Sequence, residues 1–395
     1  MLEVFIAFLK LGLTSFGGPV AHLGYFRTEF VERRRWLDDR SYTDLVALCQ
    51  FLPGPASSQV GMALGMRRAG WPGALAAWLG FTLPSAIALT LFAFGVTHWL
   101  ALAQSGVVHG LKVMAVAVVA QAVMGMARSL CPDRLRAAVA MAAAMLVLLV
   151  PGVWAQVAAM GLGALIGRAA LPLPQGAALA QEDGYGIGKR AGGVLLVLFV
   201  VLLLASFAVA GSGQPSLLAL AAKFYQAGSL VFGGGHVVLP LLQSAVVPAY
   251  LSNDVFLAGY GAAQAVPGPL FTFAAYLGAA MPASAQWWSG WGGALVMLVA
   301  IFLPAFLLVI GALPFWQSLR MRPGVQRAMA GVNAAVVGVL LAALYDPVWT
   351  SAIHSPADFA LALLAFGLLV LARWSPVWVV LVAAAAGCVG WGGWV

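Results

Sequence analysis

The segments Gly12-Leu13-Thr14-Ser15-Phe16-Gly17-Gly18-Pro19 and Gln50-Phe51-Leu52-Pro53-Gly54-Pro55 interrupt the first apolar stretches of this chain. Past the middle the same pair returns as Gly228-Ser229-Leu230-Val231-Phe232-Gly233-Gly234-Gly235 and Gln264-Ala265-Val266-Pro267-Gly268-Pro269. From the first Gly to the Pro-Gly-Pro the spacing is 41 residues in one copy and 39 in the other. Broken backbone is tolerated at membrane depth only where protein buries it or where it lines a polar cavity. Paired interrupted segments in two halves point to the binding site of a transporter.

The composition is that of a polytopic membrane protein. Of 395 residues 63% are hydrophobic and 8% are charged, and the mean hydropathy is +0.98, far above that of soluble domains. The 20 Lys and Arg lie mostly in short loops, as expected of cytoplasmic anchoring and not of nucleic-acid binding. Cys49, Cys131 and Cys388 stand singly, so the sequence predicts no disulfide framework, no metal site and no cofactor. Met1-Leu2-Glu3 lacks a basic n-region, which predicts a retained membrane segment and not a cleaved signal.

Thirteen apolar stretches approach the ~20 residues that a membrane-spanning helix needs. The predicted fold class is an all-α polytopic membrane protein with two inverted repeats of about six segments each, containing discontinuous or re-entrant helices. The predicted domains are an N-terminal repeat at 1–170, a linker and connecting span at 171–215, and an inverted C-terminal repeat at 216–395. The stretches are 1–26, 42–66, 71–100, 106–127, 135–150, 152–170, 191–211, 216–250, 254–280, 287–313, 325–345, 356–372 and 376–395.

The distribution of basic residues predicts the inversion. The first half is basic around 27–40, 67–68 and 128–136, whereas the equivalent loops of the second half contain no Lys or Arg. The second half is basic at Arg320, Arg322, Arg327 and Arg373, where the matching loops of the first half are neutral. Because basic loops face the cytoplasm, complementary patterns predict antiparallel halves.

The stretch 42–66 has basic residues at both ends, Arg40 on one side and Arg67 and Arg68 on the other. Both ends therefore favour the same side of the membrane. A segment broken at Pro53-Gly54-Pro55 satisfies this by entering and returning. The alternative is an ordinary crossing with one exceptional basic loop.

The residues after the first Pro-Gly-Pro suit an anion. Pro55 fits the first turn of a new helix, and the free N–H groups and dipole of a helix start favour negative charge. Ser57, Ser58 and Gln59 add neutral donors, whereas the second copy has Leu270, Phe271, Thr272 and Phe273. Gly54 and Gly268 lie at the centres of the two breaks. The alternative is a pair of proline kinks that serve helix packing.

The glycine-rich breaks carry further candidates. Consecutive glycines, Gly17-Gly18 and Gly233-Gly234, form concave N–H nests or allow close helix contacts. His22 and His236 follow them, and a histidine there either contacts an anion or bonds across helices. Gln50 and Gln264 each precede a Pro-Gly-Pro by three residues and offer amide donors to an oxyanion or caps to freed carbonyls.

The charges inside the apolar stretches favour an anion as cargo. Lys10 and Lys223 precede the glycine-rich breaks as possible charge partners, and Lys112 lies near the start of another stretch; such lysines either serve function or reach for the interface. No Asp or Glu lies in the middle of a stretch, although a cation pathway would use carboxylates. Arg33-Arg34-Arg35-Trp36 is interpreted as an interfacial anchor in preference to an anion funnel.

Other functional classes fit less well. An enzyme needs a nucleophile with its base or a metal cluster, and the five His show no ligand spacing. No P-loop supports an ATP-driven pump. A channel for small anions stays open beside a secondary transporter.

The strings Phe16-Gly17-Gly18-Pro19-Val20-Ala21-His22, Trp36-Leu37 and Leu48-Cys49-Gln50-Phe51-Leu52-Pro53-Gly54-Pro55 with Ser58-Gln59 resemble the signature of the chromate ion transporter family. Phe232-Gly233-Gly234-Gly235-His236 with Gln264, Pro267, Gly268 and Pro269 repeats it more briefly. The resemblance covers both halves and matches the long, two-domain form. It implies export of chromate from the cytoplasm, driven by the electrochemical gradient and giving chromate resistance, in a bacterial-type plasma (inner) membrane.

The expected partners are chromate and the lipid bilayer, with no nucleic acid and with a homo-oligomer left open. Chromate and sulfate are both tetrahedral dianions, so sulfate or another oxyanion is the alternative cargo. The candidate anion-binding residues are Gly17, Gly18, His22, Gln50, Gly54, Ser57, Ser58, Gln59, Gly233, Gly234, His236, Gln264, Gly268 and Thr272, with Lys10 and Lys223 as possible charge partners.

Overall fold

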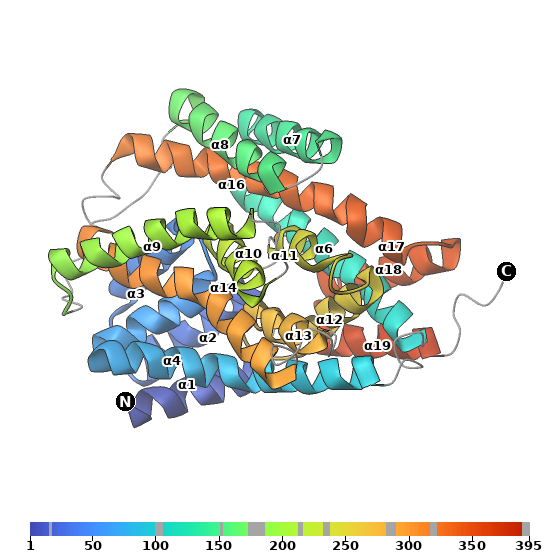
Figure 1. The fold of residues 1–395 in the computed structure, drawn as a ribbon, viewed down its shortest axis with the longest axis horizontal. Helices are drawn as coiled ribbons and strands as arrows, with labels where there is room; N and C mark the ends of the chain where they lie inside the picture. Colours follow the sequence, from blue (N-terminus) through green and yellow to red (C-terminus); the bar gives the residue numbers. More distant parts are fainter. Residues whose placement is uncertain are drawn as a thin grey trace.

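The computed structural model describes residues 1–15, 18–98, 106–150, 153–172, 186–211, 216–231, 238–281, 290–316 and 322–388. The elements within these ranges are all helices (Figure 1). The first half contains α1 (Leu2–Thr14), α2 (Gly18–Phe26), η1 (Arg27–Arg33), α3 (Asp39–Phe51), α4 (Ala56–His98), α6 (Gly106–Leu130), α7 (Arg134–Leu149) and α8 (Val153–Ala170). After α9 (Lys189–Ala210), the second half contains α10 (Leu217–Leu230), α11 (Val238–Val246), α12 (Asn253–Ala265), η3 (Leu270–Thr272), α13 (Phe273–Ala280), α14 (Gly290–Ala312), η5 (Leu313–Phe315), α16 (Pro323–Ala343), η6 (Leu344–Trp349), α17 (Thr350–Ala352), α18 (Pro356–Val370) and α19 (Pro376–Cys388). The predicted all-α class is confirmed.

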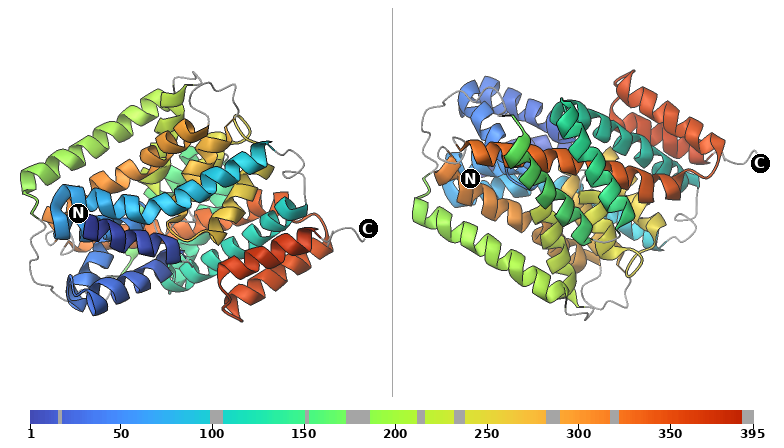
Figure 2. Two further views of the ribbon diagram at one scale, coloured as in Figure 1. Left: turned by 90° about the horizontal axis from the view of Figure 1, so that it is seen from below. Right: turned by 90° about the horizontal axis from the view of Figure 1, so that it is seen from above.

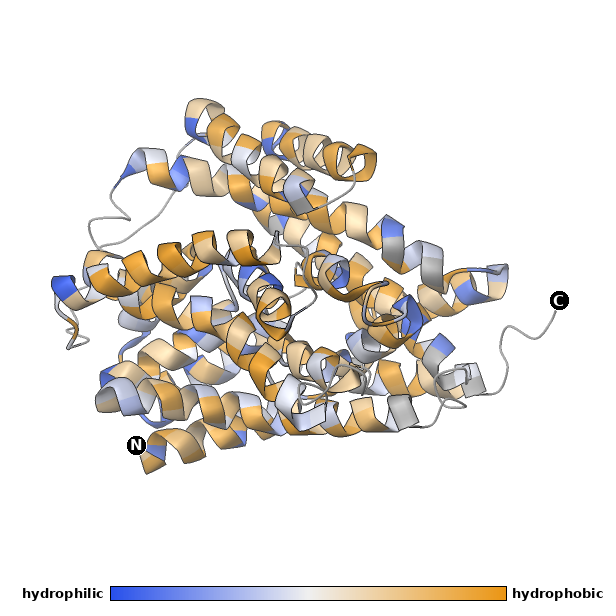
Figure 3. Ribbon diagram, in the orientation of Figure 1, coloured by the Kyte–Doolittle hydropathy of each residue, from blue (hydrophilic) through white to orange (hydrophobic). Residues whose placement is uncertain are grey.

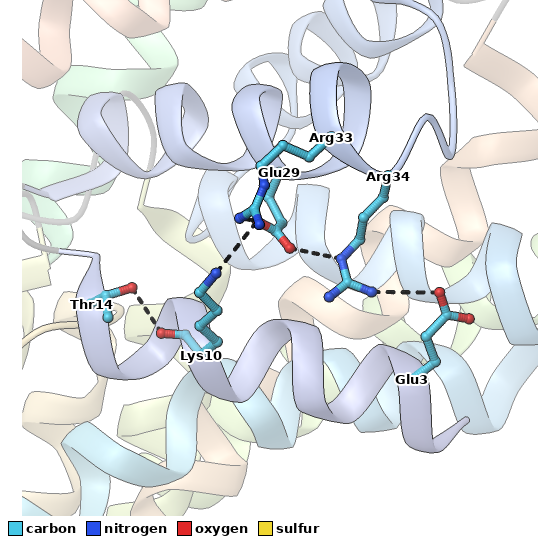
Figure 4. A network of polar contacts seen from close by, with 6 residues as sticks. All are labelled: Glu3, Lys10, Thr14, Glu29, Arg33 and Arg34. Carbon is cyan, nitrogen blue, oxygen red and sulfur yellow. Dashed lines mark hydrogen bonds and ion pairs between the residues drawn. The ribbon is translucent and has the colours of Figure 1, made fainter.

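The first apolar stretch, 1–26, folds back on itself instead of continuing as one interrupted span. Figure 4 shows α1 and η1 side by side, with Lys10 reaching Glu29 and Arg34 reaching Glu3. Glu29 is 5% exposed and also accepts from Arg33 and Arg34 at 2.7 Å each. The buried Glu29 carboxylate, which the sequence places in a basic loop, therefore has cations on both arms of the hairpin, Lys10 on one and Arg33 and Arg34 on the other.

The second interrupted stretch also begins and ends in one place. The Arg68 guanidinium lies 5.6 Å from the Trp36 ring, and α3 begins three residues after that ring, at Asp39. The two ends of the segment 39–68 therefore lie together, which is the arrangement that re-entry predicts. At Ala69 and Gly70 the backbone leaves the helical region, and Gly65 packs directly on the Gly73 carbonyl. Two helices, 56–68 and 71–98, thus form α4, as the boundary between 42–66 and 71–100 predicts.

The second half repeats these hairpins. α12 and α13 are joined by the second Pro-Gly-Pro and η3, and the hydroxyl of Tyr276, in the middle of α13, donates to the Val255 carbonyl near the start of α12 at 2.7 Å. α10 and α11 are also in contact. In Figure 1, α1, α2 and α3 lie at the left, whereas α11, α12 and α13 lie toward the centre and right.

The remaining helices are exchanged between the halves. α6 of the first half packs along α18 and α19 of the second, and α16 of the second half packs along α7 and α8 of the first (Figures 1 and 2). Glycines allow backbone contact at both seams, Gly110 on Ala383 and Gly331 on Gly163. A hydrogen bond and an ion pair among the described residues also join the halves. The His109 ring lies 2.6 Å from Asp358 and the Lys112 ammonium 2.8 Å from Asp254.

Five helical segments of the described chain are long and apolar enough to cross a membrane: Ala56–Gly95, His109–Arg128, Lys189–Ala210, Gly290–Phe315 and Pro323–Asp346. Helix α9, which contains the predicted linking span, is the most apolar of these and the least buried. Figure 3 shows it hydrophobic along nearly its whole length. A helix at the periphery with an apolar surface on all sides is suited to lipid contact.

Candidate functional site at the crossed hairpin tips

The two Pro-Gly-Pro breaks have the same backbone shape. α3 ends where Leu52 turns extended (ψ 148°), and Gly54 takes φ +116°. The counterpart Gly268 takes φ +110°. Other residues are strained at such angles, so the glycine of each break is required by its conformation. We call residues 52–55 the first tip and residues 266–269 the second tip.

Each tip donates to the opposite half. The Gly54 N–H donates to the Val231 carbonyl at 2.6 Å, and the Gly268 N–H donates to the Ser15 carbonyl at 3.0 Å. Ser15 and Val231 are the last described residues before the two glycine-rich breaks. The four interrupted segments therefore cross at one place through a reciprocal pair of backbone hydrogen bonds.

The glycines also allow close packing there. A Cβ on Gly54 would lie 3.2 Å from the Ala305 Cβ and 3.1 Å from the Gln59 amide nitrogen. On Gly268 it would lie 2.8 Å from the Ser85 hydroxyl and 3.2 Å from the Phe81 carbonyl. Each tip thus rests on the proline-containing helix of the other half, α14 or α4.

Polar side chains gather after the first tip. The first backbone hydrogen bond of α4 runs from the Gln59 N–H to the Pro55 carbonyl. The N–H groups of the residues before Gln59 in this first turn therefore have no partner within the helix. Ser57 and Ser58 are 2% and 3% exposed. The Ser57 hydroxyl lies 3.4 Å from His22 Nδ1, and His22 is 1% exposed with no partner on Nε2. Two predicted site residues far apart in sequence, His22 and Ser57, are therefore in contact.

Gln59 has a different role from the predicted one. It is completely buried, and its amide nitrogen donates to the Pro53 carbonyl at 2.8 Å. Its remaining oxygen can only accept a hydrogen bond. Gln59 therefore caps the first tip through one of its two amide N–H groups.

The second tip is apolar where the first is polar. Phe271 and Phe273 are buried in the places equivalent to Ser57 and Gln59. Thr272 is 1% exposed, and its hydroxyl donates to the Pro269 carbonyl at 2.7 Å. The second tip thus satisfies its own donor, and the predicted inequality of donors between the tips is present in the geometry.

Three buried hydroxyls near the tips were not singled out from the sequence. Ser15 and Thr82 are 0% and 1% exposed, and among the described residues their hydroxyls have no hydrogen-bond partner. Ser85, also 1% exposed, donates to the Thr82 carbonyl at 3.1 Å. A comparison of the halves, anchored on Pro84 and Pro304, aligns Thr82 with Phe302 and Ser85 with Ala305. A hydroxyl in one half that faces an apolar residue at the same position of the other half is the sequence signal by which Thr82 and Ser85 can be identified.

The other predicted residues lie as follows. Gly18 begins α2 with φ +77°. Gln50 is exposed, whereas its counterpart Gln264 is partly buried with no partner on its amide nitrogen. Lys10 is directed toward Glu29 (Figure 4), 4.0 Å away, and Lys223 is partly buried in α10. Gly17, Gly233, Gly234 and His236 lie outside the described residues.

Comparisons with known proteins agree with the repeated architecture. A family model described as chromate transporter matches residues 2–168 and again residues 218–388. The chain is 30% identical to the chromate transport protein of Pseudomonas aeruginosa, over 98% of this chain and 91% of the relative. It is 26% identical to the probable chromate transport protein of Synechococcus elongatus, over 97% and 94%. It is 26% identical to the chromate transport protein of Cupriavidus metallidurans, over 87% and 81%.

No solved structure matches this chain. The two family matches together cover most of its length, and each contains one glycine-rich break and one Pro-Gly-Pro tip. The chain is a multi-pass membrane protein that belongs to the chromate transporter family.

Proposed function

We propose that this protein is a secondary active transporter that exports chromate from the cytoplasm and so confers chromate resistance. The observation that carries the proposal is the reciprocal crossing of two interrupted hairpins, Gly54 on Val231 and Gly268 on Ser15. Interrupted helices that meet between inverted repeats are where secondary transporters bind their cargo. Membership of a transporter family, and relatives named chromate transport protein, support the choice of cargo.

The chemistry beside the first tip supports a dianion as cargo. The first turn of α4 provides backbone N–H groups at a positive helix end, and Ser57, Ser58 and His22 stand beside it. Donors of this kind bind an oxyanion without the strong attraction of a buried Lys or Arg, and moderate binding lets the cargo leave.

Transport would follow from movement of the crossed hairpins. The polar side chains beside the first tip are at most 3% exposed, so the site is closed to solvent in this conformation. Because the halves are inverted, an opening on one face and its mirror movement on the other give alternating access. A bacterial-type inner membrane, with the basic loops on the cytoplasmic side, is the location that this orientation fits.

The decisive experiment is uptake of labelled chromate into inverted vesicles, with sulfate as competitor. We expect accumulation above the external concentration, and loss of that accumulation when the coupling gradient is collapsed; collapsing the pH and voltage gradients separately identifies that gradient. Equilibration without accumulation would indicate a channel. Accumulation of sulfate but not chromate would indicate a transporter for another oxyanion.

A further inference from the structure

Among the described residues, five buried polar atoms without partners lie on the first-half side of the crossed tips. They are Ser15 Oγ, His22 Nε2, Ser58 Oγ, Gln59 Oε1 and Thr82 Oγ1, each in a residue at most 3% exposed. Buried side-chain polar atoms are nearly always hydrogen-bonded, and each exception in a folded protein calls for an explanation. His22, Ser58 and Gln59 are among the candidate site residues, whereas Ser15 stands in the first glycine-rich break without being a candidate and Thr82 lies outside the motifs.

Contacts of these residues and of their chain neighbours bring this part of the chain together. The His22 ring lies 3.4 Å from the Ser57 hydroxyl, beside Ser58, and its centroid is 5.2 Å from that of Phe81, beside Thr82. Gly268 joins the other side, because its N–H donates to the Ser15 carbonyl and its Cα faces the Phe81 carbonyl. Helices α1 and α4 pack along each other here (Figure 2).

Hydrogen bonding at the tips occupies four backbone carbonyls, whereas the Gln59 side-chain oxygen keeps no partner among the described residues. The carbonyls of Ser15 and Val231 accept from the tip glycines. The Pro53 carbonyl accepts from the Gln59 amide, and the Pro269 carbonyl from the Thr272 hydroxyl. A cation would need such carbonyl oxygens, whereas the unpartnered hydroxyls and the N–H groups at the start of α4 suit an anion.

The same positions in the second half do not provide donors. Val231 stands where the first half has Ser15, and Phe302 where it has Thr82. Both are buried, at 0% and 2% exposure. The two hydroxyls are therefore not part of the repeated framework that shapes the tips, since the second half forms the same backbone without them.

We propose that Ser15 and Thr82 bind the transported oxyanion directly, as two further hydroxyl donors that complete a one-sided site with His22 and Ser58. This inference rests on the proposed function, because it assumes that a tetrahedral oxyanion enters the crossed tips. The substrate class is a tetrahedral dianion of the size of chromate or sulfate.

The test compares Ser15→Ala and Thr82→Val with Thr90→Val in full-length protein reconstituted in proteoliposomes. Thr90 is a matched control, since it is buried on the same helix but its hydroxyl donates to the Ala86 carbonyl at 2.7 Å. Losing one neutral donor to a charged ligand weakens binding about tenfold. We expect that rise in the chromate KM and in the dissociation constant for Ser15→Ala and Thr82→Val, and less than about twofold for Thr90→Val.

Stability separates binding from a structural role. A hydroxyl without a partner stabilises nothing in the empty protein, so Thr82→Val should leave its melting temperature unchanged or raise it, while the thermal shift produced by chromate shrinks. Thr82→Ser retains the hydroxyl and should restore binding. Wild-type chromate affinity in both Ser15→Ala and Thr82→Val, or a fall in the melting temperature of the empty protein matched by lost transport, would overturn this inference. Failure of the wild-type protein itself to bind or move chromate or sulfate would instead refute the proposed function.

Discussion

The two hairpin tips share a backbone but not a chemistry. Gly54 and Gly268 have nearly the same φ, +116° and +110°, and each donates to the opposite half. Yet Ser57 and Gln59 follow the first tip where two phenylalanines follow the second. Duplication has kept the residues that shape the crossing, because each glycine and proline is needed by the geometry. It has not kept the donors, and a single small dianion needs only one set of them.

The largest expected effect is an all-or-none result on topology. Single cysteines at Asp39 and Arg68, whose side chains are 60% and 51% exposed, should react with an impermeant maleimide from the cytoplasmic side. One at Ser252, an exposed residue before α12, should react from the opposite side, because the second tip enters from there. The background would lack Cys49, Cys131 and Cys388. Labelling of the Asp39 and Arg68 positions from opposite sides would contradict re-entry. Labelling of the Ser252 position from the same side as these two would contradict inversion.

The next largest effect is loss of transport when bulk is added at a tip. Gly54→Leu should abolish chromate transport while the protein still reaches the membrane. A non-glycine residue at this φ costs roughly 1–3 kcal/mol, and its side chain would displace Gln59 and Ala305. The measurement is initial transport rate per inserted molecule.

The matched control for that change is Gly161→Leu. Gly161 has no atom within 4 Å of its would-be Cβ and lies in α8, away from both tips. It should therefore retain transport. Gly268→Ala should behave like Gly54→Leu because its Cβ would meet Ser85 and Phe81; normal transport in Gly268→Ala would mean that only one tip shapes the site.

A smaller, graded effect separates the donors of the two tips. Replacing Ser57 and Ser58 together by Ala should weaken chromate affinity roughly 10- to 100-fold, since two donors near a charged ligand are lost. Thr272→Val should change it less than about threefold, because that hydroxyl already donates to Pro269. Equilibrium binding on purified protein measures both. Equal losses would mean that the halves contribute alike.

Much of the fold follows from residue patterns. Gly-rich and Pro-Gly-Pro breaks in apolar stretches predict the interrupted hairpins, and alternating basic loops predict the inversion. The composition of the first break does not predict that the chain reverses within 1–26, because a break has the same composition whether the chain continues across the membrane or turns back. The outcome depends on contacts across the hairpin, such as the pairs of Glu29 with Lys10 and of Arg34 with Glu3. The exchange of α6 and α16 depends on backbone contacts such as Gly110 on Ala383, which single helices do not reveal.

The site is predicted less completely than the fold. His22, Ser57 and Ser58 stand out because they flank a break, and His22 and Ser57 are in contact. Ser15 also stands beside a break and Thr82 does not, but neither is a candidate, since a single hydroxyl in a membrane helix normally bonds to its own backbone, as Thr90 does. Gln59 is predicted as a donor, and the structure uses one of its two amide N–H groups to cap the Pro53 carbonyl. Such choices depend on which carbonyls are left free, and that is a property of the folded chain.

The smallest expected effect concerns the ion pairs of the first hairpin. In the second half, the helix α11 is apolar and has no charged side chain among its described residues, Val238–Val246. Glu29→Gln keeps the shape of a side chain that is 7% exposed but weakens its bonds to Arg33 and Arg34. The loss of charge-assisted hydrogen bonds predicts about 2 kcal/mol less stability, measured as a lower melting temperature in detergent. Glu3→Gln, at a side chain 49% exposed, should leave the melting temperature unchanged because exposed ion pairs contribute little. If both variants melt like the wild type, apolar contacts such as Phe8 against Phe26 and Phe30 hold this hairpin, and the two halves are stabilised in the same way.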